Sequence, residues 1–145
     1  MKEFQIPGVL RLELADGWTV TGGELPTLEI VPEEPVGALH LTVLRSKAQT
    51  VDANSEARRL VERFVRDRGL IMPQPLSDFD GPGQYAVSCK PDSPGGTAWD
   101  VVAIVGHERA VVETYAHGNT SDKRRREALH IIGSTRLGTT GRDGP

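Results

Sequence analysis

One stretch decides the fold of this chain: Trp99-Asp100-Val101-Val102-Ala103-Ile104-Val105-Gly106-His107-Glu108-Arg109-Ala110-Val111-Val112-Glu113-Thr114-Tyr115-Ala116-His117. Apolar residues recur at every second position over residues 97–105, which is typical of a β-strand. The second half of this segment is apolar on both faces, so we expect a central strand that is covered on both sides. A tight connection at residues 106–109 leads into a second strand over residues 110–117. The sequence therefore predicts an antiparallel hairpin at this position.

Short alternating segments before this hairpin predict further strands. Residues 9–14 alternate between aliphatic and charged side chains, and Asp16-Gly17 is expected to form a turn into a returning strand that starts at Trp18. More strands are predicted over residues 28–31, 38–45 and 84–90. We expect these strands to form one central, mostly antiparallel, twisted sheet of about six to seven strands with the hairpin.

Two segments change to the helical period. Apolar residues recur at i, i+3, i+4, i+7 and i+8 from Ala57 to Val65, with Asp52 or Asn54 as N-cap and Gly69 at the C-terminal end. We expect this helix to pack on the leucine face of the strands that precede it.

A second helix is predicted over residues 121–132, with Asn119 and Asp122 as a capping box and Gly133 as C-cap. The result is an α+β fold with two main helices against the sheet. It forms a single domain over residues 1–137, followed by a disordered tail at residues 138–145.

Composition bounds the class of protein. The chain has 145 residues, of which 37% are hydrophobic and 26% charged, and this composition is that of a globular domain. Its formal net charge of −3 argues against nucleic acid as a partner. The N-terminal segment has no apolar run of signal-peptide length, and no stretch approaches the ~20 apolar residues of a membrane span. We therefore expect a cytoplasmic protein without a membrane partner.

Patterns for metals and cofactors are weak. The histidines show no metal-site spacing, and the single cysteine, Cys89, has no cysteine partner. Neither Gly81-Pro82-Gly83 nor Gly95-Gly96-Thr97 fits a phosphate-binding motif. We predict no metal and no cofactor.

A few residues could still carry catalysis. A cysteine within an alternating strand is more often a small buried hydrophobe than a nucleophile. The carboxylate pairs to consider are Asp78 with Asp80, and Asp100 with Glu113 across the predicted hairpin. The candidate catalytic residues are Asp100, Glu113, His117 and Cys89. An enzyme would need at least two of these side chains to meet in one cleft, and we expect that the protein is not an enzyme.

One cluster breaks a local rule. Lys123-Arg124-Arg125-Arg126 places four cations at the start of the second helix, where the helix dipole disfavours them. An anionic partner would explain this cluster. The alternative is a solvated face neutralised by Asp122, Glu127 and acidic residues near the third predicted strand. Trp18 lies near a turn and is open to a surface role, so the candidate partner-binding residues are Arg124, Arg125, Arg126 and Trp18.

Several short motifs resemble those of the PsbP- and DcrB-like family. These motifs are Phe4-x-Ile6-Pro7, Asp16-Gly17-Trp18, Trp99, the Gly106/Arg109 turn, the run from Ala110 to Ala116 and the run from Ala128 to Leu137. The resemblance implies an α/β/α sandwich with a central antiparallel sheet. It also implies a non-enzymatic binding module. Family members include photosystem II extrinsic subunits, a Ran-binding transport factor, envelope proteins and chaperones of secretion effectors. The resemblance carries over no catalytic residues.

The leading functional hypothesis is a non-catalytic cytoplasmic protein-binding module of the adaptor, chaperone or immunity type. Its partner would be another protein, and a second copy of the chain is one candidate. This hypothesis requires an exposed apolar or mixed-charge patch or a dimer interface. The alternative is a small-ligand carrier, which requires a pocket of ~300 Å³ or more between sheet and helix.

Overall fold

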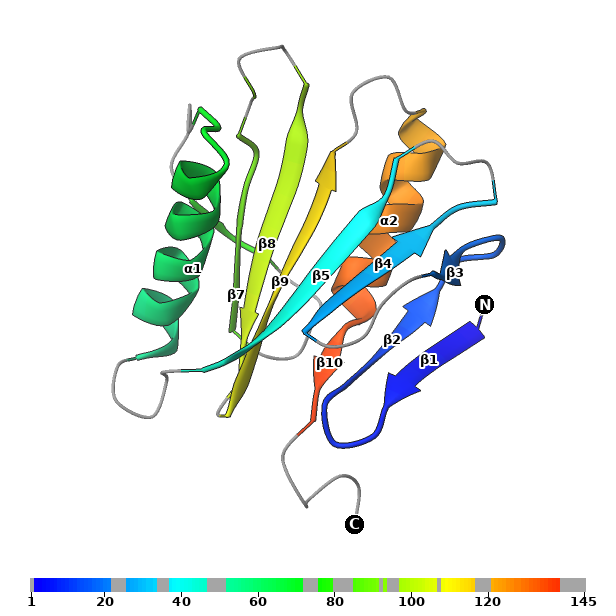
Figure 1. The fold of residues 1–145 in the computed structure, drawn as a ribbon, viewed down its shortest axis with the longest axis horizontal. Coiled ribbons are helices and arrows are strands. Elements are labelled where there is room, and N and C mark those ends of the chain that lie inside the picture. The colour runs from blue at the N-terminus through cyan, green and yellow to red at the C-terminus, as the bar shows by residue number, and fades with distance from the viewer. Residues whose placement is uncertain are drawn as a thin grey trace.

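A computed structural model of the chain describes residues 2–21, 26–33, 37–46, 52–71, 76–79, 85–91, 93, 97–106, 108–116 and 121–138. In chain order the elements are β1 (Lys2–Ile6), β2 (Leu10–Leu14), β3 (Thr19–Val20), β4 (Thr27–Val31), β5 (Leu39–Arg45), α1 (Ala53–Asp67), β6 (Ser77–Asp78), β7 (Tyr85–Cys89), β8 (Trp99–Val105), β9 (Arg109–Ala116), α2 (Asp122–Ser134) and β10 (Arg136–Leu137). Figure 1 shows their arrangement.

The predicted hairpin is confirmed and lies inside the larger sheet. Strands β8 and β9 pair from Trp99 opposite Ala116 to Val105 opposite Ala110. Each strand is buried on both faces, because alternate residues enter two separate clusters of apolar side chains. Residues 101–105 are therefore all apolar because both faces of this strand are buried.

The α+β class is confirmed, and so is a central antiparallel sheet of about six to seven strands with two main helices. Only the expectation that residues 9–14 belong to this same sheet is wrong. The larger sheet has seven strands in the order β3-β4-β5-β9-β8-β7-β6, and a smaller sheet has the order β1-β2-β10. The sequence interpretation missed β1, β6 and β10. Two of these have only two residues, which is too short for an alternating pattern.

The turn at Asp16-Gly17 joins the two sheets and does not close a hairpin. Gly17 has φ +86°, a left-handed conformation that glycine adopts without strain. The strand that follows pairs with β4, where Thr19 lies opposite Val31, and not with β2. The leucines of β2 are at least 95% buried, because they lie in the core between the two sheets. Strand β2 therefore belongs to the small sheet, and β3 pairs within the larger one.

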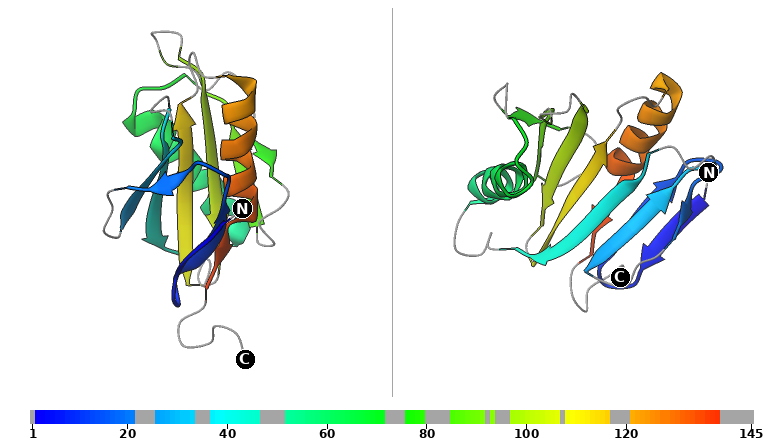
Figure 2. Two further views of the ribbon diagram at one scale, coloured as in Figure 1. Left: turned by 90° about the vertical axis from the view of Figure 1, so that its right-hand side faces the viewer. Right: turned by 45° about the horizontal axis from the view of Figure 1, so that its top comes forward.

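Helix α2 and the small sheet cover one face of the seven-stranded sheet (Figure 2). The cluster between them, called the first core here, contains Leu12 of β2, Ile30 of β4, Leu41 of β5 and Ile131 and Ile132 of α2. All five side chains are at most 1% exposed. This core joins the two sheets into one body.

Helix α1 packs on the opposite face, against β7 and β8. The expectation that it packs on the leucine face of residues 9–45 is wrong, because those leucines point into the first core. The α1 side of the sheet instead presents Val87, Val101, Ala103 and Val105, which form the second core with Leu60 and other residues of α1. Figure 1 shows α1 beside β7 and β8, at one end of the sheet.

The first helix has the predicted ends. Asp52 is the N-cap and its Oδ1 accepts a hydrogen bond from the Ser55 amide at 2.8 Å, which lowers the pKa of Asp52. Gly69, at φ +66°, follows the C-cap. The C-terminal glycine therefore has the left-handed conformation that the sequence indicated.

The second helix has different ends from those predicted. Ser121 is its N-cap and accepts a hydrogen bond from the Arg124 amide at 3.2 Å, so the predicted Asn119 cap is wrong. Gly133 lies within the helix, and the C-cap is Thr135. Of the predicted tail, Gly138 donates its amide to the Val9 carbonyl oxygen at 2.8 Å. Residues 139–145 and Asn119 lie outside the described residues.

Candidate binding grooves

Helix α1 covers only part of its face of the sheet, and a groove follows its uncovered side. This helix groove has a volume of about 310 Å³. Its lining residues come from β4, β5 and β9, which form the floor, and from α1, which forms the wall. It is lined by Thr27, His40, Thr42, Leu44, Leu60, Arg63, Phe64, Asp67, Arg68, Val112 and Thr114.

Aromatic and cationic side chains form the wall of the helix groove. The Arg68 guanidinium lies 5.1 Å from the centre of the Phe64 ring, and that ring meets Trp99 edge-on at 6.0 Å. Arg63 and Asp67 form a loose ion pair of 3.6 Å with side chains about 60% exposed. The wall is therefore apolar at depth and charged at an open rim.

The floor of the helix groove is polar at one end. Thr42 lies between Thr27 and Val112 in the register of the three strands. Beyond this row, His40 Nε2 lies 3.1 Å from Glu29 Oε2 on the exposed face of β4 and β5. Hydroxyl and imidazole groups can thus bond a polar partner beside the apolar residues.

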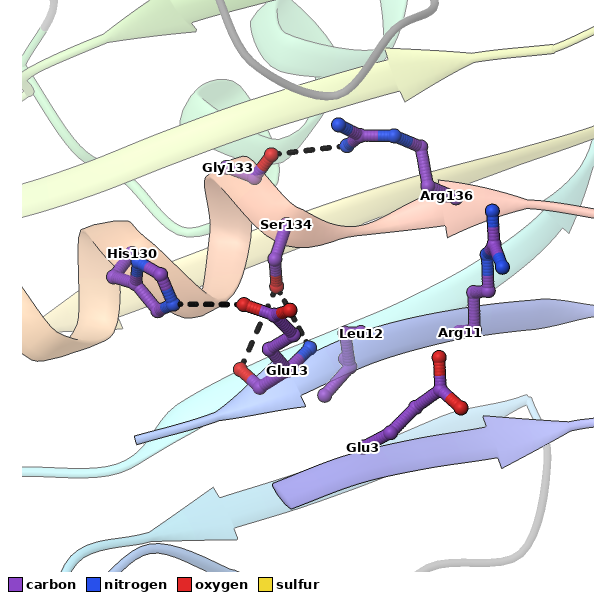
Figure 3. Close-up of a pocket in the computed structure, with 8 residues that line it drawn as sticks. All are labelled: Glu3, Arg11, Leu12, Glu13, His130, Gly133, Ser134 and Arg136. Carbon is purple, nitrogen blue, oxygen red and sulfur yellow. Dashed lines mark hydrogen bonds and ion pairs between the residues drawn. The ribbon is translucent and has the colours of Figure 1, made fainter. Parts of the chain in front are cut away.

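A second groove lies between the small sheet and the C-terminal end of α2 (Figure 3). This charged groove has a volume of about 500 Å³. It is lined by Glu3, Arg11, Leu12, Glu13, His130, Gly133, Ser134 and Arg136. Apart from Leu12, its side chains are polar or charged, so it differs in chemistry from the helix groove.

Several polar atoms of the charged groove already have partners. His130 Nε2 lies 3.3 Å from Glu13 Oε1, and Ser134 Oγ accepts a hydrogen bond from the Glu13 amide at 2.8 Å (Figure 3). Arg136 donates from Nη1 to the Gly133 and Thr135 carbonyl oxygens, both at 3.0 Å. These bonds fasten α2 to the small sheet, and they satisfy carbonyl groups at the end of the helix.

The predicted arginine cluster is mostly engaged within the molecule. Arg124 Nη1 lies 2.9 Å from Glu127 Oε1, and Arg125 holds Asp100 through two hydrogen bonds of 2.9 Å. The Asp100 side chain is only 5% exposed, so this pair fixes α2 to β8. Arg126 is exposed. Partner binding by Arg124, Arg125 and Arg126 remains a prediction.

A surface position for Trp18 is wrong. Its side chain is 3% exposed, and its ring centre lies 6.2 Å from that of Tyr115 in the first core. The indole Nε1 donates to Glu127 Oε1 at 3.0 Å. Burial acts to raise the pKa of Glu127, but the hydrogen bonds from Trp18 and Arg124 outweigh it and the pKa is lowered. The Trp18 ring is thus buried against apolar neighbours, and its N–H has a hydrogen-bond acceptor.

The proposed catalytic candidates do not meet in either groove. Asp100 and Glu113 face the first core, whereas Cys89 faces the second. Burial raises the pKa of the Cys89 thiol to about 11, so it is protonated at neutral pH and a poor nucleophile. Asp78 lies on β6 and is exposed, and Asp80 and His117 lie outside the described residues.

The described residues offer neither a metal site nor a membrane-spanning helix. Within the described part of the chain, no group of three or more histidine, cysteine, aspartate or glutamate side chains could hold a metal ion. Neither described helix has the length and apolar character needed to cross a membrane. The grooves are therefore the features on which a functional proposal can be built.

The architecture is that of PsbP-like proteins, as solved structures show. Cyanobacterial PsbP (CyanoP) from Synechocystis sp. PCC 6803 matches with a TM-score of 0.67 at 8% identity, over 94% of this chain and 91% of that one. LpqN, involved in cell envelope biogenesis of Mycobacterium tuberculosis, matches with a TM-score of 0.56 at 13% identity over the same shares. These likenesses confirm the fold that the sequence motifs implied.

A third structure, from Bacteroides thetaiotaomicron VPI-5482, matches with a TM-score of 0.66 at 12% identity over 99% of this chain. The match covers 51% of that protein, so the chain spans about half of its length. No protein-family model matches the sequence, and no curated protein matches it either. At such identities the comparisons establish the fold alone.

The sequence interpretation named a pocket between sheet and helix only as a requirement of the small-ligand alternative, and it identified the lining of neither groove. It assigned Phe64 to the helix stripe that packs on the sheet, and it placed no functional role on Arg68 or Arg11. The exposed face beside α1 depends on which strands the helix covers, and local sequence carries no signal for that choice.

Proposed function

We propose that this chain is a non-catalytic module that binds another protein through the helix groove. One observation carries the proposal: α1 leaves an open, concave surface in which Phe64, Leu44 and Val112 lie beside Arg63 and Arg68. Aromatic residues and arginine are the side chains that most often dominate binding energy at protein interfaces.

The chemistry of the groove defines what the partner must present. An apolar side chain would pack on Leu44 and Val112, while an acidic group would pair with Arg68 at the rim. The Arg68 head is held over Phe64 at 5.1 Å, so its position is partly set before binding. Cys89 lines neither groove and is buried in the second core, which supports a role without catalysis.

The open rim favours a protein over a small molecule. Pockets for small molecules bury 70–90% or more of their ligand, whereas Arg63 and Asp67 leave about 60% of their side chains in solvent. A small-ligand carrier is the second candidate, because the volume of about 310 Å³ reaches the size that such a carrier requires.

Capture from lysate with groove variants tests the proposal. Thr42→Arg places a long side chain in the groove, and Arg68→Glu reverses the charge at its rim. The matched control is Arg58→Glu, which makes the same charge change on the opposite side of α1. We expect one reproducible partner to be retained by the wild type and the control, and reduced at least tenfold by both groove variants.

Two results would count against this function. A partner that binds all variants equally would place the interface elsewhere, and no reproducible partner would argue against a protein-binding role. Native mass spectrometry of the purified protein addresses the second candidate. A small molecule that copurifies with the wild type and is lost from Thr42→Arg would favour the carrier.

The adaptor, chaperone or immunity role and the cytoplasmic location are part of the same proposal. The formal net charge of −3 is consistent with a protein partner and does not favour nucleic acid or an anionic membrane. Fractionation of the source cells with an antibody against the chain tests the compartment. Recovery in an envelope fraction would contradict it.

A further inference from the structure

The outer face of the small sheet carries two like-charged rows that run across its strands. In the register, Glu3 of β1 lies opposite Glu13 of β2, and Arg11 of β2 lies opposite Arg136 of β10. We call the first pair the acidic row and the second the basic row. Like charges directly opposite each other on neighbouring strands destabilise a sheet, so an isolated chain holds these rows at a cost.

Each row has one member that lacks a partner. Glu13 pairs with His130, and Arg136 bonds the carbonyl oxygens at the end of α2. Arg11 and Glu3 make no ion pair and no side-chain hydrogen bond within the described residues, and both side chains are exposed (Figure 3). The unpaired arginine therefore lies on the middle strand β2, and the unpaired carboxylate lies on the neighbouring edge strand β1.

That edge is strand β1, which pairs only with β2 in the described part of the chain. Its outer side faces away from the rest of the molecule (Figure 1). Phe4 and Ile6 on the core side of β1 are only half-buried. An open strand edge of five residues offers unpaired backbone N–H and C=O groups to another strand.

We propose that β1 pairs antiparallel with β1 of a second copy of this chain, about a twofold axis at Phe4. This register places Phe4 opposite Phe4 and Glu3 opposite Gln5 of the second copy. The two small sheets then form one six-stranded sheet with the same face outward. A twofold contact of this kind is closed and self-complementary, as in most soluble homodimers.

The charges select this register. Within one copy, Gln5 lies opposite Arg11. Across the axis, Gln5 lies opposite Glu3 of the second copy. The basic row of each copy is therefore in line with the acidic row of the other, with Gln5 between them. Arg11 and Glu3 of the second copy are then two strands apart, roughly 10 Å between Cα atoms, which their extended side chains can bridge. Each unpaired charge gains a partner of opposite sign.

The neighbouring registers are worse. An axis at Glu3 would place Glu3 opposite Glu3, which is a like-charge contact. An axis at Gln5 would align the basic rows of both copies and would bring Pro7, which has no N–H, opposite Glu3. Only the axis at Phe4 uses all five residues of β1 and joins rows of opposite charge.

The contact is small, so the dimer is weak. A five-residue strand pair lies at the low end of interface sizes, and we expect a dissociation constant on the order of 10–100 µM that rises with salt. This inference uses a different surface from the helix groove, so it stands or falls independently of the proposed function.

Sedimentation equilibrium on the purified full chain, over a wide range of concentrations, tests the dimer. We expect self-association of the wild type at low ionic strength. Arg11→Glu alone and Glu3→Arg alone should each weaken association at least tenfold, because each brings like charges together across the axis. Arg58→Glu, which changes the same charge far from β1, should associate as the wild type does.

A mixture of the two variants gives the decisive result. Arg11→Glu in one copy meets Glu3→Arg in the other, and the native Arg11 and Glu3 form the second contact, so the mixed pair regains both attractions. We expect heterodimers with the wild-type dissociation constant. A monomeric wild type at the highest concentration, single variants that associate normally, or a mixture that stays monomeric would each overturn the proposal. Circular dichroism and urea midpoints identify any variant that has lost its fold.

Discussion

The carboxyl group of Glu113 makes the stability of this protein depend on pH. Glu113 lies on β9 beneath α2 and is 0% exposed. The nearby Thr135 hydroxyl donates its single proton to the Ile131 carbonyl oxygen at 3.1 Å, and neither Glu113 oxygen has a hydrogen-bond donor among the described residues. Burial raises the pKa of Glu113 from 4.5 to about 8.

The sign of the effect follows from proton binding. The unfolded chain loses this proton near pH 4.5, whereas the folded protein keeps it until about pH 8. In this window the folded state binds more protons, so the free energy of unfolding falls as pH rises. The slope is about 1.4 kcal/mol per pH unit, or roughly 3 kcal/mol between pH 5 and pH 7.

Glu113→Gln removes this titration and keeps the size of the side chain. Urea unfolding of both proteins at pH 5, 6, 7 and 8 gives the difference in their free energies of unfolding. Whatever constant offset the amide introduces, we expect the variant to gain about 1.4 kcal/mol on the wild type with each pH unit between pH 5 and pH 7, and about 1 kcal/mol between pH 7 and pH 8, where the folded carboxyl group begins to ionise. The comparison also removes the opposite trend of Asp52 and Glu127, whose lowered pKa values give stability that is lost as pH falls.

A matched control is Glu62→Gln, which changes an exposed carboxyl group on α1. Its profile should run parallel to that of the wild type. If the Glu113→Gln profile is also parallel over this range, then Glu113 is ionised in the folded protein and the reasoning from burial is refuted.

Three further predictions concern the helices and the thiol. Arg125→Ala leaves the nearly buried Asp100 without its bidentate partner and should lower the free energy of unfolding by about 1–3 kcal/mol, while Arg126→Ala should leave it within about 0.5 kcal/mol in the same urea titration. Ser121→Ala removes the N-cap of α2 and should cost about 1 kcal/mol, so an unchanged urea midpoint would contradict the assigned cap. Cys89 should resist a thiol reagent at pH 8 and react at once in urea, because the folded thiol is buried and protonated; rapid labelling of the native protein would disprove this.

The local features of the fold were readable from the sequence. The alternation of residues 97–116 predicted a hairpin, and the i, i+3, i+4 spacing from Ala57 to Val65 predicted α1 with its caps. Each of these patterns reflects interactions within a few residues along the chain. The period of the apolar residues reports secondary structure for that reason.

The sequence did not show which helices and strands lie next to one another. The leucines of β2 are compatible with any apolar face, and only packing shows that they lie between two sheets and not beside β3. The apolar side of α1 is likewise compatible with any apolar face of the sheet. In the structure it packs on β7 and β8 and leaves the face of β4 and β5 open. An apolar pattern specifies that a face is buried, and it does not specify against what.

The candidate sites depend on the same choice. Sequence singled out Arg124 to Arg126, but it could not show that Arg125 reaches Asp100, which lies 25 residues away. The position of Trp18 near a turn left it open to a surface role, and tertiary packing buries it.

By itself, the sequence determined the class of fold, the central hairpin and both helices, because hydrophobic periodicity and capping act over short stretches of chain. Only the tertiary structure decided the two-sheet topology, the cover of α1 and the charge rows at β1, because non-local packing and strand register decide which residues meet. The helix groove and the free edge of β1 are what that packing leaves exposed.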